Sequence, residues 1–242
     1  MGNDITQLID AYQSCQERLP SLPKEPLLSD PLPTYPFERV SADLFQTGSH
    51  YALVYSDRLS GWTVVHQWRH TSSAKEVARD VVRNFINLGA PLCFRSDGGP
   101  QFDAKKFRDT LTRWGVEWRP SSPTYAQSNG HAEAVVKAVK SLMLKTATPG
   151  DLSNETFLRG LLELRNTPDA TGFYPAEIIF GHQLRSIGPA HRSSFHPRWA
   201  TVAEARYRQA TIEDGVKAHY DVHSRSLRPL QIGQPVRAQD SV

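Results

Sequence analysis

The sequence has 242 residues, of which 39% are hydrophobic and 22% charged, and its net charge is +3. These values are ordinary for a soluble globular protein, and no apolar run approaches the roughly 20 residues of a membrane-spanning helix. The N-terminus lacks a basic segment followed by an apolar stretch, and Cys15 and Cys93 provide no disulfide framework. We therefore expect a soluble, intracellular protein without a membrane partner.

Positive charge is concentrated toward the C-terminal end. From His182 onward there are nine Arg or Lys residues, five His residues and five Asp or Glu residues. Such an excess can hold a polyanion, although a solvated, partly unstructured tail has the same composition. Composition alone leaves both interpretations open.

The N-terminal third predicts a linker followed by a β-meander. Residues 1–18 predict a short amphipathic helix, and the proline-rich stretch 19–36 predicts an extended linker. Three strands follow, separated by turn-forming segments, at Glu38–Phe45, Tyr51–Tyr55 and Trp62–Trp68. Neighbouring strands with short connections favour an antiparallel arrangement.

Helices and strands alternate after the meander. The first predicted helix is Ser72–Leu88, which Ser72 or Ser73 caps and Gly89 stops. Three more helices are predicted at Lys105–Trp114, from Ser128 or Asn129 to about Thr146, and at Glu155–Arg165. Two further strands are predicted at Pro91–Arg95 and Val116–Arg119. The order βββαβαβα requires a mixed five-stranded sheet flanked by helices, which is the ribonuclease H-like architecture. Beyond it we expect a turn-rich stretch to Gly188, a helix at Thr201–His223 and a short strand near Pro235–Arg237.

Three acidic residues fall where side chains of such a fold converge. Asp43 lies within the first strand, Asp97 at the end of the fourth strand, and Glu133 in the first turn of the long helix. The first strand is central and the strand of Asp97 lies beside it, so these two carboxylates meet at one end, with Glu133 opposite. For any one of them alone, a solvent-facing Asp or a helix-capping Glu is the simpler explanation.

A pocket of three carboxylates predicts divalent cations. Carboxylates packed together repel one another, so burial is favourable chiefly when cations neutralise them. Oxygen-only ligands favour Mg²⁺ or Mn²⁺ over zinc. Two such ions would activate a water or a DNA 3′-hydroxyl for attack on a phosphodiester, which is phosphoryl-transfer chemistry.

The residues around the carboxylates form several spaced motifs. They include Ser96-Asp97-Gly98-Gly99-Pro100-Gln101-Phe102, Phe107, Trp114-Gly115-Val116 and Gln127-Ser128-Asn129-Gly130, and 35 residues separate Asp97 from Glu133. Together they resemble the integrase catalytic core of retroviruses and gypsy-type LTR retrotransposons, with its Asp, Asp-35-Glu motif. The likeness covers about Pro36 to Pro189, through Asn166-Thr167-Pro168 and Gly172–Gly181.

The resemblance implies roles for the residues near the carboxylates. Asp43, Asp97 and Glu133 would be the catalytic and metal-binding residues, and Lys137 and Lys140, on the helix of Glu133, would contact DNA phosphates. The loop before that helix would add the DNA contacts Tyr125, Gln127 and Asn129. Gly98 and Gly99 would form a tight turn near a phosphate, and Gly130 would loosen the loop. The alternatives are a solvated helix face for the lysines, loop packing for Tyr125 and plain turn chemistry for the glycines.

The flanks depart from the family pattern. Family integrases carry an N-terminal zinc domain with two His and two Cys, whereas here Cys15 has Arg18 where the second cysteine is expected, so zinc is not expected. The expected organisation is a zinc-domain remnant at 1–18, a linker at 19–36, a catalytic core at 37–190, and a helical, basic extension at 191–242 that leads into a truncated β-barrel. This describes either a fragment of a polyprotein or a host-captured gene.

Three functions remain open at this point. The first is a DNA integrase that processes and transfers DNA ends, working as a homo-oligomer because two ends join one target, and acting in the nucleus. The second is a domesticated, non-catalytic module that binds DNA or chromatin. The third is a ribonuclease H-like nuclease, which shares the fold and metals, although the Gln127–Gly130 loop favours an integrase.

Overall fold

The computed structural model describes residues 31–121, 130–146, 151–222 and 224, without the side chains of residues 130–133. Residues Pro31–Ile212 form one compact unit, and Glu213 onward belongs to a separate one. The predicted helix at 1–18, most of the linker and the strand near Pro235–Arg237 lie outside the described residues. Within these ranges, no helix is long and apolar enough to cross a membrane.

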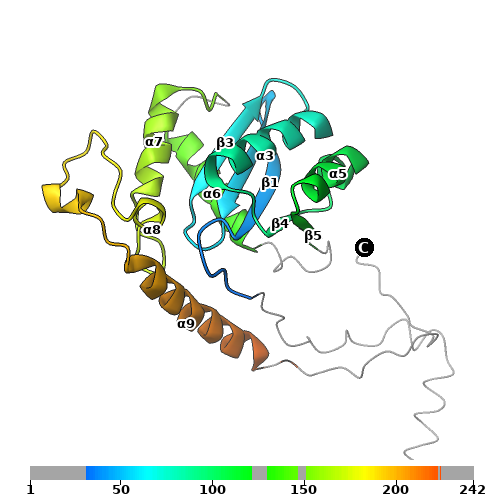
Figure 1. Ribbon diagram of the computed structural model, residues 1–242. Coiled ribbons are helices and arrows are strands. Elements are labelled where there is room, and N and C mark those ends of the chain that lie inside the picture. Colours follow the sequence, from blue (N-terminus) through cyan, green and yellow to red (C-terminus); the bar gives the residue numbers. More distant parts are fainter. Residues whose placement is uncertain (1–30, 122–129, 147–150, 223, 225–242) are drawn as a thin grey trace, which may run out of the picture. The chain divides into compact units, whose positions relative to one another are not determined.

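The described residues form a five-stranded sheet in the order β3-β2-β1-β4-β5 (Figure 1). The strands are β1 (Arg39–Thr47), β2 (His50–Asp57), β3 (Thr63–Trp68), β4 (Cys93–Ser96) and β5 (Glu117–Pro120). β1 pairs with β2, and β2 with β3, in antiparallel register, whereas β4 runs parallel to β1 and β5 runs parallel to β4. The predicted meander, the central first strand and the mixed five-stranded sheet are confirmed.

The α-helices follow the predicted order, with two additions, and one 3₁₀ helix was also not predicted. They are α3 (Ala74–Leu88), α4 (Pro100–Asp103), α5 (Lys105–Arg113), α6 (Gly130–Lys145), α7 (Glu155–Arg165), α8 (Pro175–Phe180), the 3₁₀ helix η2 (Arg192–Phe195) and α9 (Thr201–Asp221). The sequence predicted neither α4 nor α8, because four and six residues are too few for an apolar period to emerge. Both begin at a proline, which is favourable in the first helical turn.

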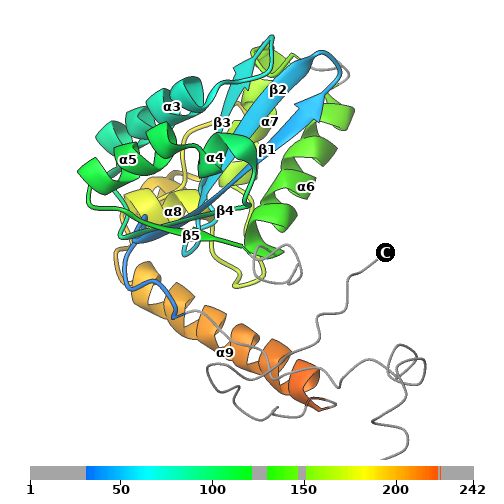
Figure 2. The same ribbon diagram turned by 90° about the vertical axis from the view of Figure 1, so that its right-hand side faces the viewer.

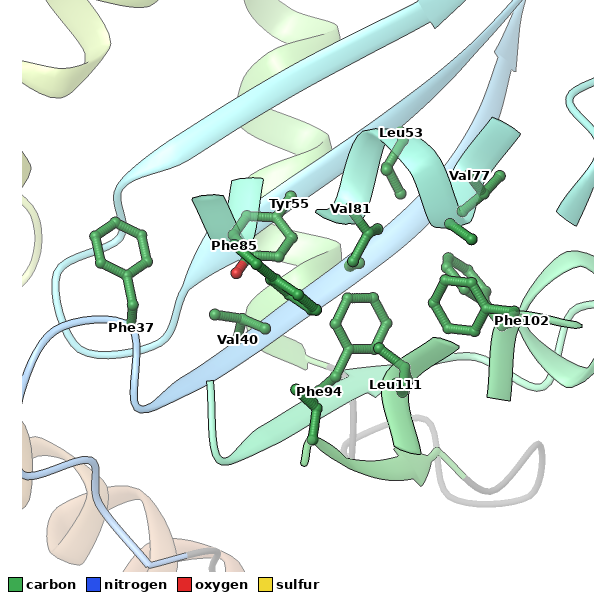
Figure 3. Close-up of a cluster of buried hydrophobic side chains, with 14 of the residues drawn as sticks. Phe37, Val40, Leu53, Tyr55, Val77, Val81, Phe85, Phe94, Phe102 and Leu111 are labelled. Carbon is green, nitrogen blue, oxygen red and sulfur yellow. The ribbon is translucent and has the colours of Figure 1, made fainter. Parts of the chain in front are cut away.

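Helices cover both faces of the sheet (Figure 2). On one face α3 and α5 bury an aromatic and aliphatic cluster that includes Val81, Phe85, Phe94 and Leu111 (Figure 3). On the other face α6 packs on β1 and β2 through Val136 and Val139, with α7 beside it. Each such side chain contributes roughly 1.5–3 kcal/mol when fully buried. The two hydrophobic cores therefore fix which face of β1 each helix covers.

Helix α3 begins with a complete capping box. The Ser73 Oγ accepts a hydrogen bond from the Glu76 backbone N–H at 3.3 Å, and the Ser73 N–H donates to Glu76 Oε2 at 2.9 Å. The hydrogen bonds that the Ser73 N–H and the Ser73 hydroxyl donate to the carboxylate, with His70 nearby, lower the pKa of Glu76 to about 2. Of the two predicted caps, Ser73 is therefore the one used, and Gly89 ends the helix with φ 92° as predicted.

A buried carboxylate lies at the end of β2, beside the start of β1. Asp57 is fully buried and accepts hydrogen bonds from the backbone N–H groups of Phe37 at 2.7 Å and Ser60 at 2.8 Å, and from the Ser60 hydroxyl at 2.6 Å. Burial raises the pKa of Asp57, although these bonds oppose the shift. Phe37 has φ 61°, which is uncommon for a bulky residue. Asp57 thus holds the entry to β1 in place by hydrogen bonding.

Candidate active site

Asp43 lies near the middle of the central strand, on the face that α6 covers. It is directly opposite Val54 on β2, so the two residues share a face of the sheet. Val54 and Phe45 belong to the hydrophobic cluster that packs against α6. The Asp43 side chain is half-buried. The sheet therefore presents this carboxylate at the edge of an apolar layer.

Asp97 directly follows β4, next to the strand that carries Asp43. The register of β1 and β4 pairs Ser41 with Arg95, and its continuation by two residues sets Asp43 against Asp97. Because paired residues of parallel strands share a face, both carboxylates belong to the α6 side. Asp97 is exposed. The prediction that these two strands are neighbours in the sheet is confirmed, and their register aligns the two acidic residues.

The turn after Asp97 is shaped around its carboxylate. The Gly99 N–H donates a hydrogen bond to Asp97 Oδ1 at 3.2 Å, and a Cβ on Gly99 would lie 3.1 Å from the same oxygen. Glycine at this position therefore leaves room for the carboxylate. Gly98 has no positive φ, and a Cβ there would meet no atom of the described residues within 4 Å. The structure shows a close approach to the Asp97 carboxylate at Gly99, and the role of the two glycines near a phosphate stays a prediction.

Ser96, the last residue of β4, fixes the end of this strand by hydrogen bonds, and the sequence alone indicated no role for it. It is fully buried, and its Oγ accepts a hydrogen bond from Trp118 Nε1 at 3.0 Å. Its carbonyl oxygen accepts bonds from the Ser121 N–H at 2.8 Å and the Ser121 hydroxyl at 3.1 Å. These bonds tie the residue before Asp97 to β5. A serine directly before the acidic residue was the available signal.

Glu133 occupies the first turn of α6, as predicted, and Gly130 is the first residue of that helix. Its side chain lies outside the described part of the structure. Position 133 is three residues before Val136, which is buried against the sheet. Residues three apart lie on the same side of a helix. The backbone therefore places position 133 on the side of α6 that faces β1.

Lys137 and Lys140, two of the three lysines of α6, are both exposed, and Lys140 contacts β1. The Lys140 ammonium lies 5.0 Å from the centroid of the Phe45 ring, and Phe45 is two residues from Asp43 on the same face of β1. Lys137 stands three residues earlier on the helix. Both lysines therefore add positive charge on the carboxylate side of the sheet. Tyr125, Gln127 and Asn129 lie outside the described residues.

Two histidines outside the predicted triad, His66 and His70, have local partners. His66 Nε2 lies 3.0 Å from Asn84 Oδ1, and His70 Nε2 lies 3.0 Å from Glu76 Oε1. Among the side chains that the structure describes, which exclude Glu133, no three His, Cys, Asp or Glu residues are grouped to hold a metal ion. The predicted triad, which includes Glu133, therefore lies partly outside the described side chains.

Comparison with known proteins identifies the domain. Residues 33–126 match the integrase core domain family. The chain contains an integrase core domain. The matched segment includes both Asp43 and Asp97 and ends before Glu133. The resemblance that the spaced motifs suggested is therefore confirmed at the level of the family.

Curated relatives of this integrase core domain are mainly retroviral polyproteins. The Gag-Pol polyprotein of walleye dermal sarcoma virus is 31% identical over 71% of the chain, and that of feline leukemia virus is 30% identical over 81%. An uncharacterized protein of Caenorhabditis elegans is 26% identical over 99% of the chain. The chain spans 10%, 12% and 19% of the lengths of these three relatives, respectively.

Solved integrase structures share the fold. A chain of the simian T-cell lymphotropic virus intasome, in complex with a PP2A regulatory subunit, matches with a TM-score of 0.57 and 16% identity; the match covers 79% of this chain and 71% of that chain. The catalytic core domain of BIV integrase matches with a TM-score of 0.50 and 19% identity, covering 59% and 93%. At these identities the likeness establishes the ribonuclease H-like fold, as the order of elements predicted.

Proposed function

We propose that this chain is the catalytic part of a DNA integrase, which cleaves and joins phosphodiester bonds at DNA ends through Asp43, Asp97 and Glu133. The observation that carries the proposal is the continued β1–β4 register, which aligns Asp43 with Asp97 on the face that α6 covers. The integrase core match and the similarity to an intasome chain support it.

The chemistry of the donor set fits Mg²⁺ or Mn²⁺. All three groups are carboxylates, and hard divalent cations prefer oxygen ligands, whereas zinc favours sets with nitrogen or sulfur. Asp97 is exposed and Asp43 half-buried, so solvent reaches both. When bound, such ions activate a water or a DNA 3′-hydroxyl and stabilise the leaving oxygen during in-line attack. Asp43, Asp97 and Glu133 would hold them.

The surrounding residues position DNA and the carboxylates. Lys137 and Lys140 would bind phosphates on the same side of the sheet, since both ammonium groups are exposed there. Ser96 is a positioning residue, because its bonds to Trp118 and Ser121 fix the backbone that carries Asp97. The loop that precedes Gly130 would supply three further DNA contacts, Tyr125, Gln127 and Asn129.

The partners and organisation follow from the proposed reaction. Strand transfer joins two DNA ends to one target, so a homo-oligomer on DNA in the nucleus is expected. The division into a zinc-domain remnant at 1–18, a linker at 19–36, a core at 37–190 and an extension at 191–242 stays a prediction. Each of these segments can be tested by the activity of truncated chains.

A strand-transfer assay with oligonucleotide DNA ends tests the proposed function. Wild type is compared with Asp97→Asn, Glu133→Gln and the matched control Asp103→Asn, in Mg²⁺, in Mn²⁺ and with chelator. Asp103 is an exposed acid near Asp97, 3.6 Å from Arg108. Loss of several kcal/mol of transition-state stabilisation predicts a rate fall of roughly 100-fold or more for the first two variants only.

Two outcomes would contradict the proposal. Product formation unchanged by both Asp97→Asn and Glu133→Gln would exclude the assigned triad. Metal-independent DNA binding without product in either cation would favour the alternative, a non-catalytic DNA- or chromatin-binding module. Cleavage of RNA:DNA hybrids in place of strand transfer would favour a nuclease.

A further inference from the structure

A segment outside the candidate active site carries positive charge without any acidic residue. Between Glu177 and Glu204 the sequence contains three Arg, three His and no Asp or Glu. Residues 181–199 of this segment, which connect α8 with α9, are called the basic strap below. Its cationic and ionisable side chains are His182, Arg185, His191, Arg192, His196 and Arg198. In Figure 1 the strap, in yellow, projects beyond α7 and α8.

Hydrogen bonds fasten the two ends of the strap to the domain. The Arg198 N–H donates to the Gly181 carbonyl at 2.6 Å, which brings the end of the strap back to its start. The Leu184 N–H donates to Asn166 Oδ1 at 2.9 Å, and Asn166 Nδ2 donates to the Leu184 carbonyl at 2.7 Å. The Gln183 N–H donates to the Ser194 carbonyl at 3.2 Å. The strap therefore presents its side chains from a backbone with a defined path.

The three arginines of the strap are exposed. Arg198 lies 3.9 Å from the Glu177 carboxylate, at the limit of an ion pair. Arg185 and Arg192 form no ion pair with any residue that the structure describes. Arg159 on α7, by contrast, is paired with the carboxylate of Glu155 one helical turn away. The strap thus holds guanidinium groups whose charge is not balanced locally.

An exposed indole accompanies these arginines. Trp199 is 64% exposed, and a Cβ on Gly181 would lie 3.1 Å from its ring. Gly181, with φ 75°, therefore allows the backbone to contact the ring, which leaves most of the indole facing solvent. Arginine suits bidentate binding of phosphate, and an exposed aromatic ring packs against sugars or bases. This combination fits the backbone of a nucleic acid.

We propose that the basic strap is a second DNA-binding surface of this chain, which contacts the phosphate backbone through Arg185 and Arg192 without reading sequence. The chemical class of the partner, DNA, rests on the proposed function. An anionic lipid surface is disfavoured because the strap is irregular, with one 3₁₀ turn at η2, and not a long amphipathic helix. The surface contributes affinity and takes no part in the chemistry.

The salt dependence of DNA binding tests the strap. The affinity of the full chain for a duplex oligonucleotide is measured over a salt series with chelator present, for wild type, Arg185→Gln/Arg192→Gln and the control Arg108→Gln/Arg159→Gln. The control removes the same charge from arginines that lie beside Asp103 and Glu155. Each lost phosphate contact lowers the slope of log affinity against log salt by about 0.9. The strap variant should lose about two units of slope, and the control almost none.

Equal salt slopes of DNA affinity for the strap variant and wild type would overturn the proposal. An equal loss of slope in the strap variant and the control would also overturn it, because it would indicate an effect of net charge. Binding to vesicles of anionic phospholipid that the strap variant loses, with an unchanged DNA slope, would assign the strap to a membrane. The thermal midpoint of each variant should match wild type, because exposed substitutions usually change stability by less than about 0.5 kcal/mol.

The same variants separate this inference from the proposed function. A reduced slope in the strap variant with no strand-transfer product from any form of the protein would support the strap and contradict the integrase activity. Strand-transfer product from wild type, together with an unchanged salt slope in the strap variant, would contradict DNA binding by the strap and leave the integrase activity supported.

Discussion

The Lys140 ammonium lies 5.0 Å from the centre of the Phe45 ring, so a cation on α6 rests against the strand that carries Asp43. Phe45 is buried, whereas Lys140 is exposed, so the ammonium lies over the ring while it stays accessible to water. Attraction between the ring face and the ammonium contributes about 0.5–1 kcal/mol at an exposed site. The contact limits how far the cation can move from the carboxylate side.

Replacement of Lys140 with Gln should weaken DNA binding uniformly across sequences. One phosphate contact is lost, so the salt slope of DNA affinity should fall by about 0.9, whereas Lys140→Arg should retain it. The control is Lys145→Gln, which replaces an exposed lysine in the last turn of the same helix. A fluorescence anisotropy titration measures all three. An unchanged slope for Lys140→Gln would mean that Lys140 is only a solvated residue.

Replacement of Asp57 with Asn should destabilise the domain without affecting DNA chemistry directly. The amide has one acceptor oxygen in place of two, so at least one of the donors from Phe37 and Ser60 loses its partner inside the protein. A buried unsatisfied donor costs about 1–3 kcal/mol. Urea denaturation of Asp57→Asn beside the exposed control Asp103→Asn measures the difference. Equal midpoints for both variants would contradict this role.

Glu76 should make stability depend on pH in the acid range. Its pKa falls to about 2 in the folded protein from an ordinary value of 4.5, chiefly because Ser73 donates hydrogen bonds to the carboxylate. A lowered carboxyl pKa stabilises the folded state above the unfolded pKa, and this stabilisation is lost as pH falls from about 4.5 toward 2. The stability gap between wild type and Glu76→Gln should therefore be constant above about pH 5 and close below it. Thermal melting from pH 2 to 7 tests this, and a gap that widens at low pH would contradict it.

Replacement of Arg165 with Lys should loosen the contact of α7 with β3. The guanidinium lies 4.1 Å from the Trp62 ring centroid and donates to the Thr63 carbonyl through Nε at 3.1 Å and Nη2 at 2.7 Å. Burial lowers its pKa to about 10. A lysine cannot reproduce two donors on one oxygen together with the stacking, which predicts a loss of about 1–3 kcal/mol. Arg159→Lys on the same helix, exposed, should change stability little in the same denaturation experiment.

The sequence predicted the topology because the pattern and the connections left few alternatives. The three short-linked strands could only form a meander, and the alternating units after it placed β4 beside β1, next to Asp43. Strand ends were less certain, since β2 extends to Asp57 rather than to Tyr55. Ser56 and Asp57 are buried polar residues, and polar residues at a strand end are usually read as a turn.

The candidate site was predictable in part for a related reason. Asp43 and Asp97 belong to regular elements, so their positions followed from strand order. The support beneath Asp97 was not predictable, because the bonds of Ser96 to Trp118 and Ser121 join residues more than 20 positions apart. The basic strap was equally hidden, since its exposure depends on the fastening of Leu184 to Asn166. Only its positive charge and its lack of acidic residues were visible in the sequence.

The most direct test of the central claim is anomalous diffraction from crystals soaked in Mn²⁺. The proposed site predicts at least one Mn²⁺ peak bound by carboxylate oxygens of Asp43 and Asp97, with Glu133 as a ligand of the same centre, at oxygen distances of about 2.0–2.3 Å. The peak should be lost in Asp97→Asn and kept in Asp103→Asn. Mn²⁺ bound elsewhere, with Asp43 and Asp97 free of metal in a protein that still transfers DNA strands, would contradict the assignment.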